Sequence, residues 1–452
     1  MMKILFVATV TEHINAFHLP YLKRFKEQGW EVHVATHGDG DILHCDKKHN
    51  ISIERSPFKF DNLRAYFQLK SILKEEKFDI IHGHTPMGGM LARLCGKKYR
   101  KKRVTDTGNK NIAGAIGTNS VGNMARQSGM RIIYTAHGFH FYKGAPLINW
   151  LVYYPVEKLL SKYTDDLITI NREDFDLAKR KMKAKTLHYM PGVGIDVSIF
   201  SAHNTLKNIG ESSGSNISAD APSEPLKLAK RRELNIPENA TVLISVGELN
   251  KNKNHSVVIR ALAKLKNERN NNSVSGGDIG NNINNDGGVN AANLYYVICG
   301  NGVLQESLRS LAKSLDLQNN VLLLGQRKDI AELLHMSDIF VFPSLREGLP
   351  VSLMEAMASG LPCIVSDIRG NVDLIEHEKG GFLCGSGANS STVGTNKVNK
   401  PHTILEYAEA IKTLMADKQL RKRMGEYNKE AVKQFDMEVV MKLMQEIYLQ
   451  AH

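Results

Sequence analysis

The sequence predicts an α/β protein built from two doubly wound domains. Short apolar runs followed by polar helical patterns recur through the first 190 residues, and the same alternation starts again at residue 241. This alternation is typical of parallel sheets with right-handed crossover helices. A chain of 452 residues is also long enough for two or three domains, each with its own core. Because such sheets bind ligands beyond the carboxyl ends of their strands, we expect a cleft between the two domains.

Residues 1–190 form the predicted first domain. Helical patterns cover 18–29 and 63–77, between runs that are short and apolar enough to be buried strands. These runs are KILFVAT (3–9), EVHVAT (31–36), DIIHGH (79–84), RIIYTAHG (131–138) and DLITIN (166–171).

Residues 241–435 form the predicted second domain, after a linker at 191–240, and a C-terminal helix follows at 436–452. Helical patterns cover 255–268 and 304–316. The strand-like runs are TVLISVG (241–247), NLYYVICG (293–300), VLLLG (321–325), DIFVFPS (338–344) and PCIVSD (362–367). The helical tail can pack on either domain.

Four segments interrupt the pattern, at about 104–129, 203–224, 269–293 and 385–402. They are rich in Asn, Gly and Ser and carry few large apolar residues. Such segments bury too little surface to offset the entropy of ordering. We expect disordered surface insertions, although an induced binding loop is the alternative for each.

The charge is distributed unevenly along the chain. Residues 1–190 contain 31 Lys and Arg against 18 Asp and Glu, whereas the remaining residues contain 28 against 29. The basic first half favours an anionic partner such as a membrane surface, with a generally solvated basic surface as the alternative. Nucleic acid is not expected as a partner, because no basic stripe alternates with aromatic residues.

The protein is expected to be cytoplasmic. No run reaches the roughly 18 to 20 apolar residues of a membrane span. The five cysteines are scattered and lack metal-ligand spacing. Cys299 and Cys363 lie at the end of or inside apparent strands, which is typical of buried thiols in a reducing compartment.

The stretch EGLPVSLMEAMASGLPCIVSD (347–367) places Glu347 in a loop and Glu355 in the helix that follows. Pro350 fits the first helical position, and Gly360 ends the helix. The free amides around Gly348, Leu349 and Pro350 predict an anion site. Spacing alone is also compatible with two surface glutamates.

Three strand–glycine turns precede this stretch. They lie at SVGELNKNKNH (245–255), CGNGVLQ (299–305) and GQRK (325–328), and the first offers Lys251 and Lys253 as partners for a diphosphate. Together with the N-terminus of the helix that begins at Pro350, these turns predict a nucleotide-diphosphate site at one edge of one sheet. No Walker A loop, dinucleotide fingerprint or metal-binding cluster is found, so no metal site is expected.

These motifs resemble the E-x7-E signature and the ordered turns of retaining family-four glycosyltransferases with the GT-B fold. In the first domain, TAHGFHFYKGAP (135–146), DIIHGHTP (79–86) and the segment 17–36 resemble the branch that builds bacterial capsule and exopolysaccharide. The resemblance covers nearly all of the chain except the four insertions. It implies two Rossmann-like domains and transfer of a sugar.

The resemblance also implies roles for residues of the donor site. Glu347 matches the glutamate that holds hydroxyls of the donor sugar, Glu355 the one that binds ribose, and Lys253 the phosphate-binding lysine. The chain departs from the family at Glu248, where arginine is common, so Lys251 or Arg327 is expected to assist. The matching turn and loop residues are Gly247, Gly300, Asn301, Gly302, Gln326, Arg327, Gly348, Leu349 and Pro350.

In the first domain, His137 matches the active-site histidine that faces the donor sugar. The acceptor-side candidates are His18, His84, His140 and Arg172, each of which also has a structural interpretation. Paired aromatic residues in LINWLVYYPVEKLL (147–160) are candidates for membrane contact, with a place in the core as the alternative.

The implied reaction is retaining transfer from a nucleotide-diphosphate sugar, most often a UDP-sugar, to a lipid-diphosphate-linked saccharide, without metal or other cofactor. The protein is then expected at the inner face of the plasma membrane as a peripheral protein. The alternatives are a GT-B-fold sugar-nucleotide 2-epimerase and a non-catalytic member that binds a sugar nucleotide.

Overall fold

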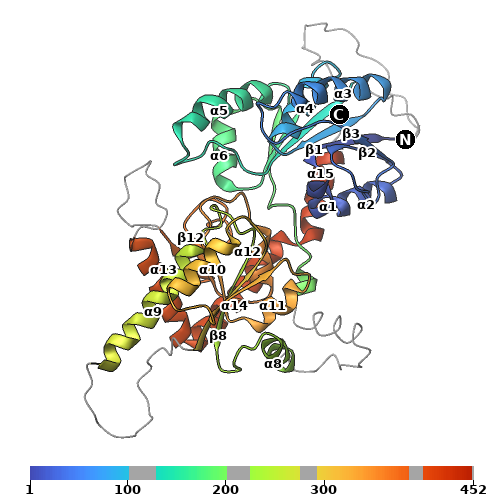
Figure 1. Ribbon diagram of the computed structural model, residues 1–452. Coiled ribbons are helices and arrows are strands. Elements are labelled where there is room, and N and C mark those ends of the chain that lie inside the picture. The colour runs from blue at the N-terminus through green and yellow to red at the C-terminus, as the bar shows by residue number, and fades with distance from the viewer. Residues whose placement is uncertain (101–128, 201–223, 275–292, 386–400, 450–452) are drawn as a thin grey trace, which may run out of the picture. The chain divides into compact units, whose positions relative to one another are not determined.

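The computed structural model describes residues 1–100, 129–200, 224–274, 293–385 and 401–449 (Figure 1). Contacts divide the chain into two compact units. Unit 1 contains Met1–Ile170, Asp174–Met190 and Met444–His452, and unit 2 contains Asn171–Glu173 and Pro191–Leu443. Most residues of the four predicted insertions lie outside the described ranges.

Unit 1 contains a seven-stranded parallel sheet in the order β3-β2-β1-β4-β5-β6-β7. The central strands are buried, as in β4, where every residue is buried, including two histidines. The strand order reverses between β1 and β4, so the carboxyl ends of these two strands mark the switch point of the sheet. The strands are β1 (Lys3–Val10), β2 (Glu31–His37), β3 (Lys47–Asn50), β4 (Ile80–His84), β5 (Arg131–Ala136), β6 (Asp166–Thr169) and β7 (Thr186–Tyr189).

Helices connect these strands as crossovers. The apolar side chains of α3 and α4 pack with the central strands in one core cluster, and a second cluster lies beneath α5. The helices are α1 (Thr11–Phe17), α2 (Leu19–Glu27), α3 (Asp61–Glu75), α4 (Pro86–Gly96), α5 (Leu147–Ser161) and α6 (Arg172–Lys181).

Unit 2 contains a six-stranded parallel sheet in the order β10-β9-β8-β11-β12-β13. Its switch point lies between β8 and β11. The strands are β8 (Thr241–Val246), β9 (Leu294–Cys299), β10 (Val321–Gly325), β11 (Ile339–Phe342), β12 (Cys363–Ser366) and β13 (Gly381–Cys384). The helices are α8 (Glu224–Glu233), α9 (Ser256–Val274), α10 (Gln305–Ser314), α11 (Ile330–Met336), α12 (Val351–Ala358), α13 (Pro401–Ala416), α14 (Lys418–Ala431) and α15 (Met437–Leu449), with short 3-10 helices at Val197–Phe200 and Val432–Phe435.

The two α/β domains predicted from the sequence are thus present, with differences at their boundaries. The described part of 191–240 belongs to unit 2, because α8 is held there by Arg231, which binds Asp338 at 2.7 Å and the Ala240 carbonyl at 2.9 Å. The end of α15 belongs to unit 1, where the Tyr448 hydroxyl lies 2.6 Å from His82 Nδ1. Among the described helices, none is long and apolar enough to cross a membrane.

Candidate functional site

The three glycine turns of unit 2 are joined to one another at the carboxyl edge of the sheet, as the sequence predicts. The Gly247 amide donates to the Cys299 carbonyl at 2.9 Å, which joins the turns after β8 and β9. The Gly300 amide donates to the Gly325 carbonyl at 2.7 Å, which joins the turns after β9 and β10. Backbone hydrogen bonds therefore fix the three turns in one layer.

Two positions in this layer require glycine. Gly300 has φ +147°, and a Cβ placed on it would lie 2.0 Å from the Gly247 carbonyl oxygen. A Cβ on Gly302 would lie 2.5 Å from the Leu249 carbonyl oxygen. Any side chain would push the turns apart, so the close backbone approach depends on both glycines.

Lys253 and Glu347 form an ion pair at the switch point of unit 2. Lys253 Nζ lies 2.7 Å from Glu347 Oε1 and 4.4 Å from the centroid of the Phe342 ring. Both side chains are mostly buried. Lys253 follows β8 and Glu347 follows β11, so the sheet order brings together a cation and an acid that are 94 residues apart.

The helix that follows Glu347 begins with free amides. Pro350 is the residue before α12, with φ −77° and ψ 121°, and no side chain in the described part of the chain caps the helix. The expectation that Pro350 occupies the first helical position is therefore wrong by one residue, because its ψ is extended. The first amides of α12 remain available to an anion, since a helix N-terminus leaves its first four N–H groups without helical partners.

Glu355 lies in α12 and is partly buried. Among the described residues, none is found to hydrogen-bond its carboxylate, and burial raises its pKa to about 7. A carboxyl group in this state gains from a ligand that donates O–H groups, because such hydrogen bonds favour the charged form.

The other polar residues predicted for the donor site are either already paired with an acid or exposed to solvent. Arg327 binds Asp329 through Nε at 2.8 Å and Nη2 at 2.6 Å, so its charge is already paired. Gln326, Glu248 and Lys251 are exposed. Of the cations predicted here, Lys253 is the one that the structure places beside Glu347.

Sequence reasoning missed several polar residues in the loops of this site. Asn250 Oδ1 accepts from the Lys253 amide at 3.0 Å, and Asn252 Nδ2 donates to the Arg346 carbonyl at 2.9 Å. Ser344 has a buried hydroxyl that finds no partner in the described part of the chain. The only available signal was their position in loops at the ends of β8 and β11.

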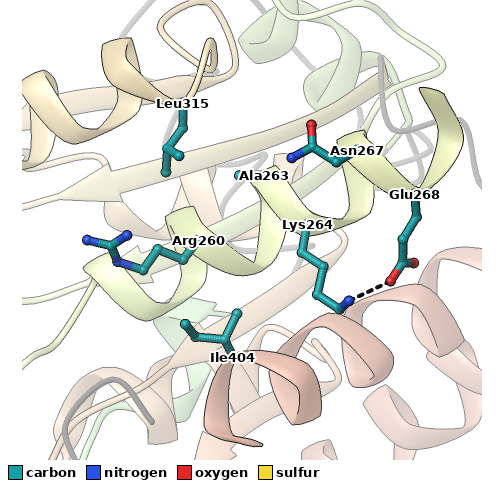
Figure 2. A pocket seen from close by; sticks show the side chains of 7 residues that line it. All are labelled: Arg260, Ala263, Lys264, Asn267, Glu268, Leu315 and Ile404. Atoms are coloured by element: carbon teal, nitrogen blue, oxygen red, sulfur yellow. Dashed lines mark ion pairs between the residues drawn. The ribbon is translucent and has the colours of Figure 1, made fainter. Parts of the chain in front are cut away.

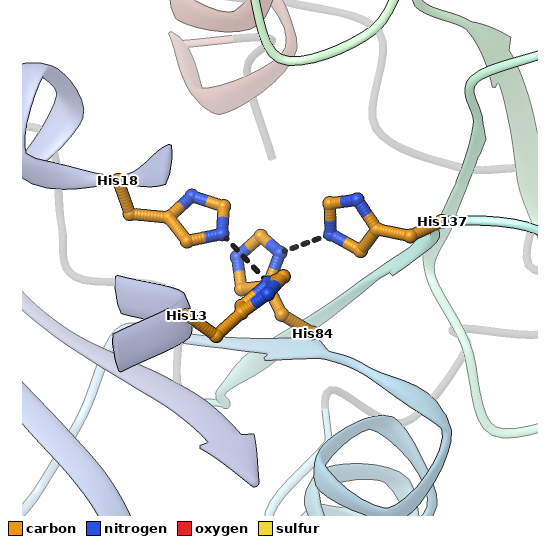
Figure 3. Close-up of side chains that lie close together, drawn as sticks. All are labelled: His13, His18, His84 and His137. Atoms are coloured by element: carbon orange, nitrogen blue, oxygen red, sulfur yellow. Dashed lines mark hydrogen bonds between the residues drawn. The ribbon is translucent and has the colours of Figure 1, made fainter. Parts of the chain in front are cut away.

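Four histidines gather at the switch point of unit 1 (Figure 3). His13 comes from α1, His18 from the junction of α1 and α2, His84 from the end of β4, and His137 from the loop after β5. His13 Nε2 lies 3.2 Å from His18 Nε2, and His84 Nδ1 lies 3.3 Å from His137 Nε2.

These histidines are neutral near pH 7. Burial lowers the pKa of His13 to about 4, with the positive charge of Arg55 as a second cause. Burial, followed by the neighbouring histidines, holds the pKa of His18, His84 and His137 well below its usual value. The cluster therefore offers lone pairs and N–H donors without charge.

The remaining candidates of the first domain lie elsewhere. His140 stacks on Tyr153 with ring centroids 4.7 Å apart and is not among the four clustered histidines. Arg172 is exposed, and its backbone amide donates to Asp373 at 2.7 Å. His82, next to the cluster, is a structural residue, because Tyr448 and Thr135 engage both of its ring nitrogens.

Helix α5 has one aromatic face and one aliphatic face. Trp150 and Tyr154 pack against the core cluster beneath the helix. Leu147, Leu151 and Leu159 are 80%, 72% and 52% exposed. Of the two alternatives for the paired aromatic residues, Trp150 and Tyr154 therefore fit the place against the core, and the exposed apolar stripe is aliphatic.

A separate hollow of about 440 Å³ lies on the surface of unit 2 (Figure 2). Its wall includes an ion pair of 2.9 Å between Lys264 and Glu268, one turn apart on α9. None of the residues predicted from the motifs lines this hollow. The candidate site of unit 2 is therefore at the switch point of its sheet and not in the hollow. The lining residues are Arg260, Ala263, Lys264, Asn267, Glu268, Leu315 and Ile404.

Comparisons with known proteins agree with this geometry. A family model described as "Glycosyl transferases group 1" matches residues 227–431, and one described as "Glycosyl transferase 4-like" matches residues 3–108. "Putative glycosyltransferase EpsD" of Bacillus subtilis (strain 168) is 34% identical over 451 residues, which is 99% of this chain and 96% of that protein.

Two further proteins extend the comparison. The Escherichia coli "UDP-Gal:alpha-D-GlcNAc-diphosphoundecaprenol alpha-1,3-galactosyltransferase" is 28% identical over 326 residues, 71% of this chain and 66% of its own length. The crystal structure of Anabaena Alr3699/HepE in complex with UDP and glucose has a TM-score of 0.65 at 17% identity, with 100% of both chains covered, and shows the shared fold. The chain belongs to the family-four glycosyltransferases with the GT-B fold, in their exopolysaccharide branch.

Proposed function

We propose that the protein is a retaining glycosyltransferase that moves a sugar from a UDP-sugar to a hydroxyl of a lipid-diphosphate-linked saccharide during exopolysaccharide synthesis. The observation that carries this proposal is the ion pair of Lys253 and Glu347 beside the uncapped start of α12. A diphosphate needs a cation and backbone amides, and a sugar needs a carboxylate that accepts from its hydroxyls. Unit 2 offers all three at one switch point.

Each donor-site group has a task in this proposal. Lys253 and the first amides of α12 stabilise the negative charge of the leaving diphosphate. Glu347 holds hydroxyls of the donor sugar, and Glu355 accepts from the ribose. Without ligand, Lys253 and Glu347 neutralise each other, which keeps both side chains in place for the incoming donor.

The proposed reaction proceeds on one face of the sugar. The bond between the anomeric carbon and the β-phosphate oxygen breaks as the acceptor oxygen bonds to that carbon from the same side. The acceptor proton passes to the released β-phosphate oxygen, so the protein supplies positioning and charge stabilisation. No metal ion takes part in this scheme.

Unit 1 is proposed to bind the acceptor saccharide and to place His137 against the reacting sugar. His18 and His84 lie in the same neutral cluster, and His140 and Arg172, which are not part of it, remain acceptor-side candidates. The name of the Escherichia coli relative includes a lipid-diphosphate acceptor, which supports the same acceptor class here.

Nucleotide binding is expected to depend on pH through Glu355. Its raised pKa means that the carboxyl is largely protonated below about pH 7, whereas ribose hydroxyls prefer the ionised form. The affinity for a UDP-sugar should therefore fall about tenfold between pH 8 and pH 6. Isothermal titration calorimetry with a UDP-sugar at several pH values measures this change in affinity. The same titration with a GDP-sugar shows which nucleobase the donor carries.

The matched control is Glu355→Gln, which keeps the shape of the side chain and removes its titration. This variant should bind the UDP-sugar more weakly at pH 8 and lose most of the pH dependence. If the variant retains the full pH dependence, Glu355 does not contact the ribose. If neither nucleotide class binds the wild type, the donor proposal fails.

Helix α5 is proposed to place unit 1 on an anionic membrane. Leu147, Leu151 and Leu159 form its exposed stripe, and Lys143 and Lys162 are exposed at its two ends. The triple change of the three leucines to serine should lower binding to anionic liposomes at least about tenfold, because each loses an apolar side chain that the lipid would bury. Flotation with and without added salt measures this.

The control for membrane binding is Leu405→Ser, which changes an exposed leucine of unit 2. It should bind liposomes like the wild type. Salt should weaken binding of both proteins, since basic residues contribute roughly 1 kcal/mol each near an anionic surface. Equal flotation of the triple variant and the wild type would exclude α5 as the contact.

A further inference from the structure

The four-histidine cluster of unit 1 has the donor set of a transition-metal site. One ring nitrogen from each of His13, His18, His84 and His137 lies within 4.8 Å of one from each of the other three. In a tetrahedral zinc site, Zn–N bonds of about 2.0–2.1 Å put ligand nitrogens about 3.3–3.4 Å apart. The Nε2 atoms of His13 and His18, 3.2 Å apart, are already close to this separation.

An unpartnered atom in the cluster points to a ligand. His84 Nε2 is buried and has no hydrogen-bond partner in the described part of the chain. A buried polar nitrogen without a partner destabilises the fold, and coordination of its lone pair would remove this penalty. The His84 ring lies beside that of His18, with the two ring centroids 4.0 Å apart.

The placement of the cluster suits a metal ion. His18 and His84 are buried and His13 and His137 partly buried, so the four rings are held close together at one site. His13 and His137 are only partly buried, so solvent reaches the cluster from their side. A small movement of these two side chains would close the longer separations.

We propose that His13, His18, His84 and His137 bind one divalent transition-metal ion, of which Zn²⁺ is the probe of choice. Imidazole nitrogens suit Zn²⁺, Cu²⁺ and Ni²⁺, whereas Mg²⁺ and Ca²⁺ prefer oxygen ligands. The cluster holds no carboxylate, so the proposal excludes the latter two ions.

A second cluster in unit 1 serves as the internal contrast. Glu31, His33 and Glu76 also lie close together, but Lys3 Nζ already binds Glu31 at 2.8 Å and Glu76 at 2.7 Å. The ammonium group satisfies both carboxylates and would repel a metal ion. Zinc binding is therefore not expected there.

A bound metal ion should also affect sugar transfer, an expectation that rests on the proposed function. His137 is the residue proposed to act on the reacting sugar, and coordination would occupy its ring nitrogen. Zn²⁺ is therefore expected to inhibit sugar transfer while leaving nucleotide binding by unit 2 unchanged.

Equilibrium dialysis of the full chain with Zn²⁺, followed by metal analysis, tests the proposal. We expect about one ion per chain in the wild type and less than about 0.1 in His18→Asn/His84→Asn. Co²⁺ should give the visible absorption of a tetrahedral site. Because the buried variant can lose its fold, the partly exposed His13→Gln should in addition weaken binding at least about tenfold, with folding checked by circular dichroism.

The controls are His140→Asn, which changes a nearby histidine outside the cluster, and His33→Gln in the contrasting cluster. Both should retain the bound ion. No ion on the wild type, or equal binding by His13→Gln, would overturn the proposal. Because dialysis uses no nucleotide or acceptor, a negative result there is distinct from a failure of the donor proposal, which titration with UDP-sugar measures separately.

Discussion

Replacement of Lys253 by methionine is expected to lower kcat/KM for sugar transfer about 100- to 1,000-fold. Methionine keeps much of the length of the side chain but removes the ammonium group that lies 2.7 Å from Glu347. The leaving diphosphate then loses a preorganised positive charge, and Glu347 is left without its partner. A steady-state transfer assay at several UDP-sugar concentrations measures the loss.

The control for this prediction is Lys264→Met on α9, in the hollow of Figure 2. Lys264 pairs with Glu268 on the surface and touches no donor-site residue named above, so its kcat/KM should stay within about threefold of the wild type. If a folded Lys253→Met variant also stays within this limit, Lys253 does not stabilise the leaving group.

Replacement of Glu157 by alanine is expected to destabilise unit 1 by about 3–5 kcal/mol. Arg93 is fully buried, and its Nη1 and Nη2 bind Glu157 at 2.7 and 3.0 Å. Its guanidinium group also lies 3.8 Å from the centroid of the Tyr134 ring. Without Glu157 the buried positive charge has no counter-ion, and α5 loses its anchor to α4.

Thermal unfolding measures this effect. For a unit of about 200 residues, each kcal/mol shifts Tm by about 2–4 °C, so the drop should be at least about 6 °C. Glu27→Ala, which removes an exposed acid with ion-pair distances of 3.9 and 4.0 Å, should change Tm by less than about 2 °C. The double change Arg93→Met and Glu157→Leu should recover most of the loss, because it removes both charges. A Tm of Glu157→Ala equal to that of the wild type would contradict this account.

The central strands of both sheets could be predicted because each is a local run of mostly apolar residues, which indicates a buried strand. Runs such as TVLISV in β8 and IFVF in β11 are continuous and apolar, as strands covered on both faces must be. The two edge strands of the unit 1 sheet could not be predicted. KKHN in β3 and TLHY in β7 are short and polar, and their extended conformation comes from pairing with β2 and β6.

The donor site was more predictable than the histidine cluster. Glu347, Lys253 and the glycine turns each follow a recognisable strand, so sheet order alone predicts that they meet. His13 carries no local signal, since it lies on a short helix between Glu12 and Ile14, outside any recognised motif. Its meeting with His18, His84 and His137 depends on the adjacency of β1, β4 and β5, which spacing along the chain does not reveal.

The most direct test of the proposed function is to incubate the protein with a UDP-sugar and a lipid-diphosphate-linked saccharide and to analyse the product by mass spectrometry and NMR. The account predicts a saccharide longer by one sugar, with the anomeric configuration of the donor, and no product from Lys253→Met on the same timescale. Conversion of the donor without acceptor would indicate an epimerase instead. Tight nucleotide binding with no turnover of any donor and acceptor pair would indicate a binding protein, and an inverted anomeric centre would contradict the single-face mechanism.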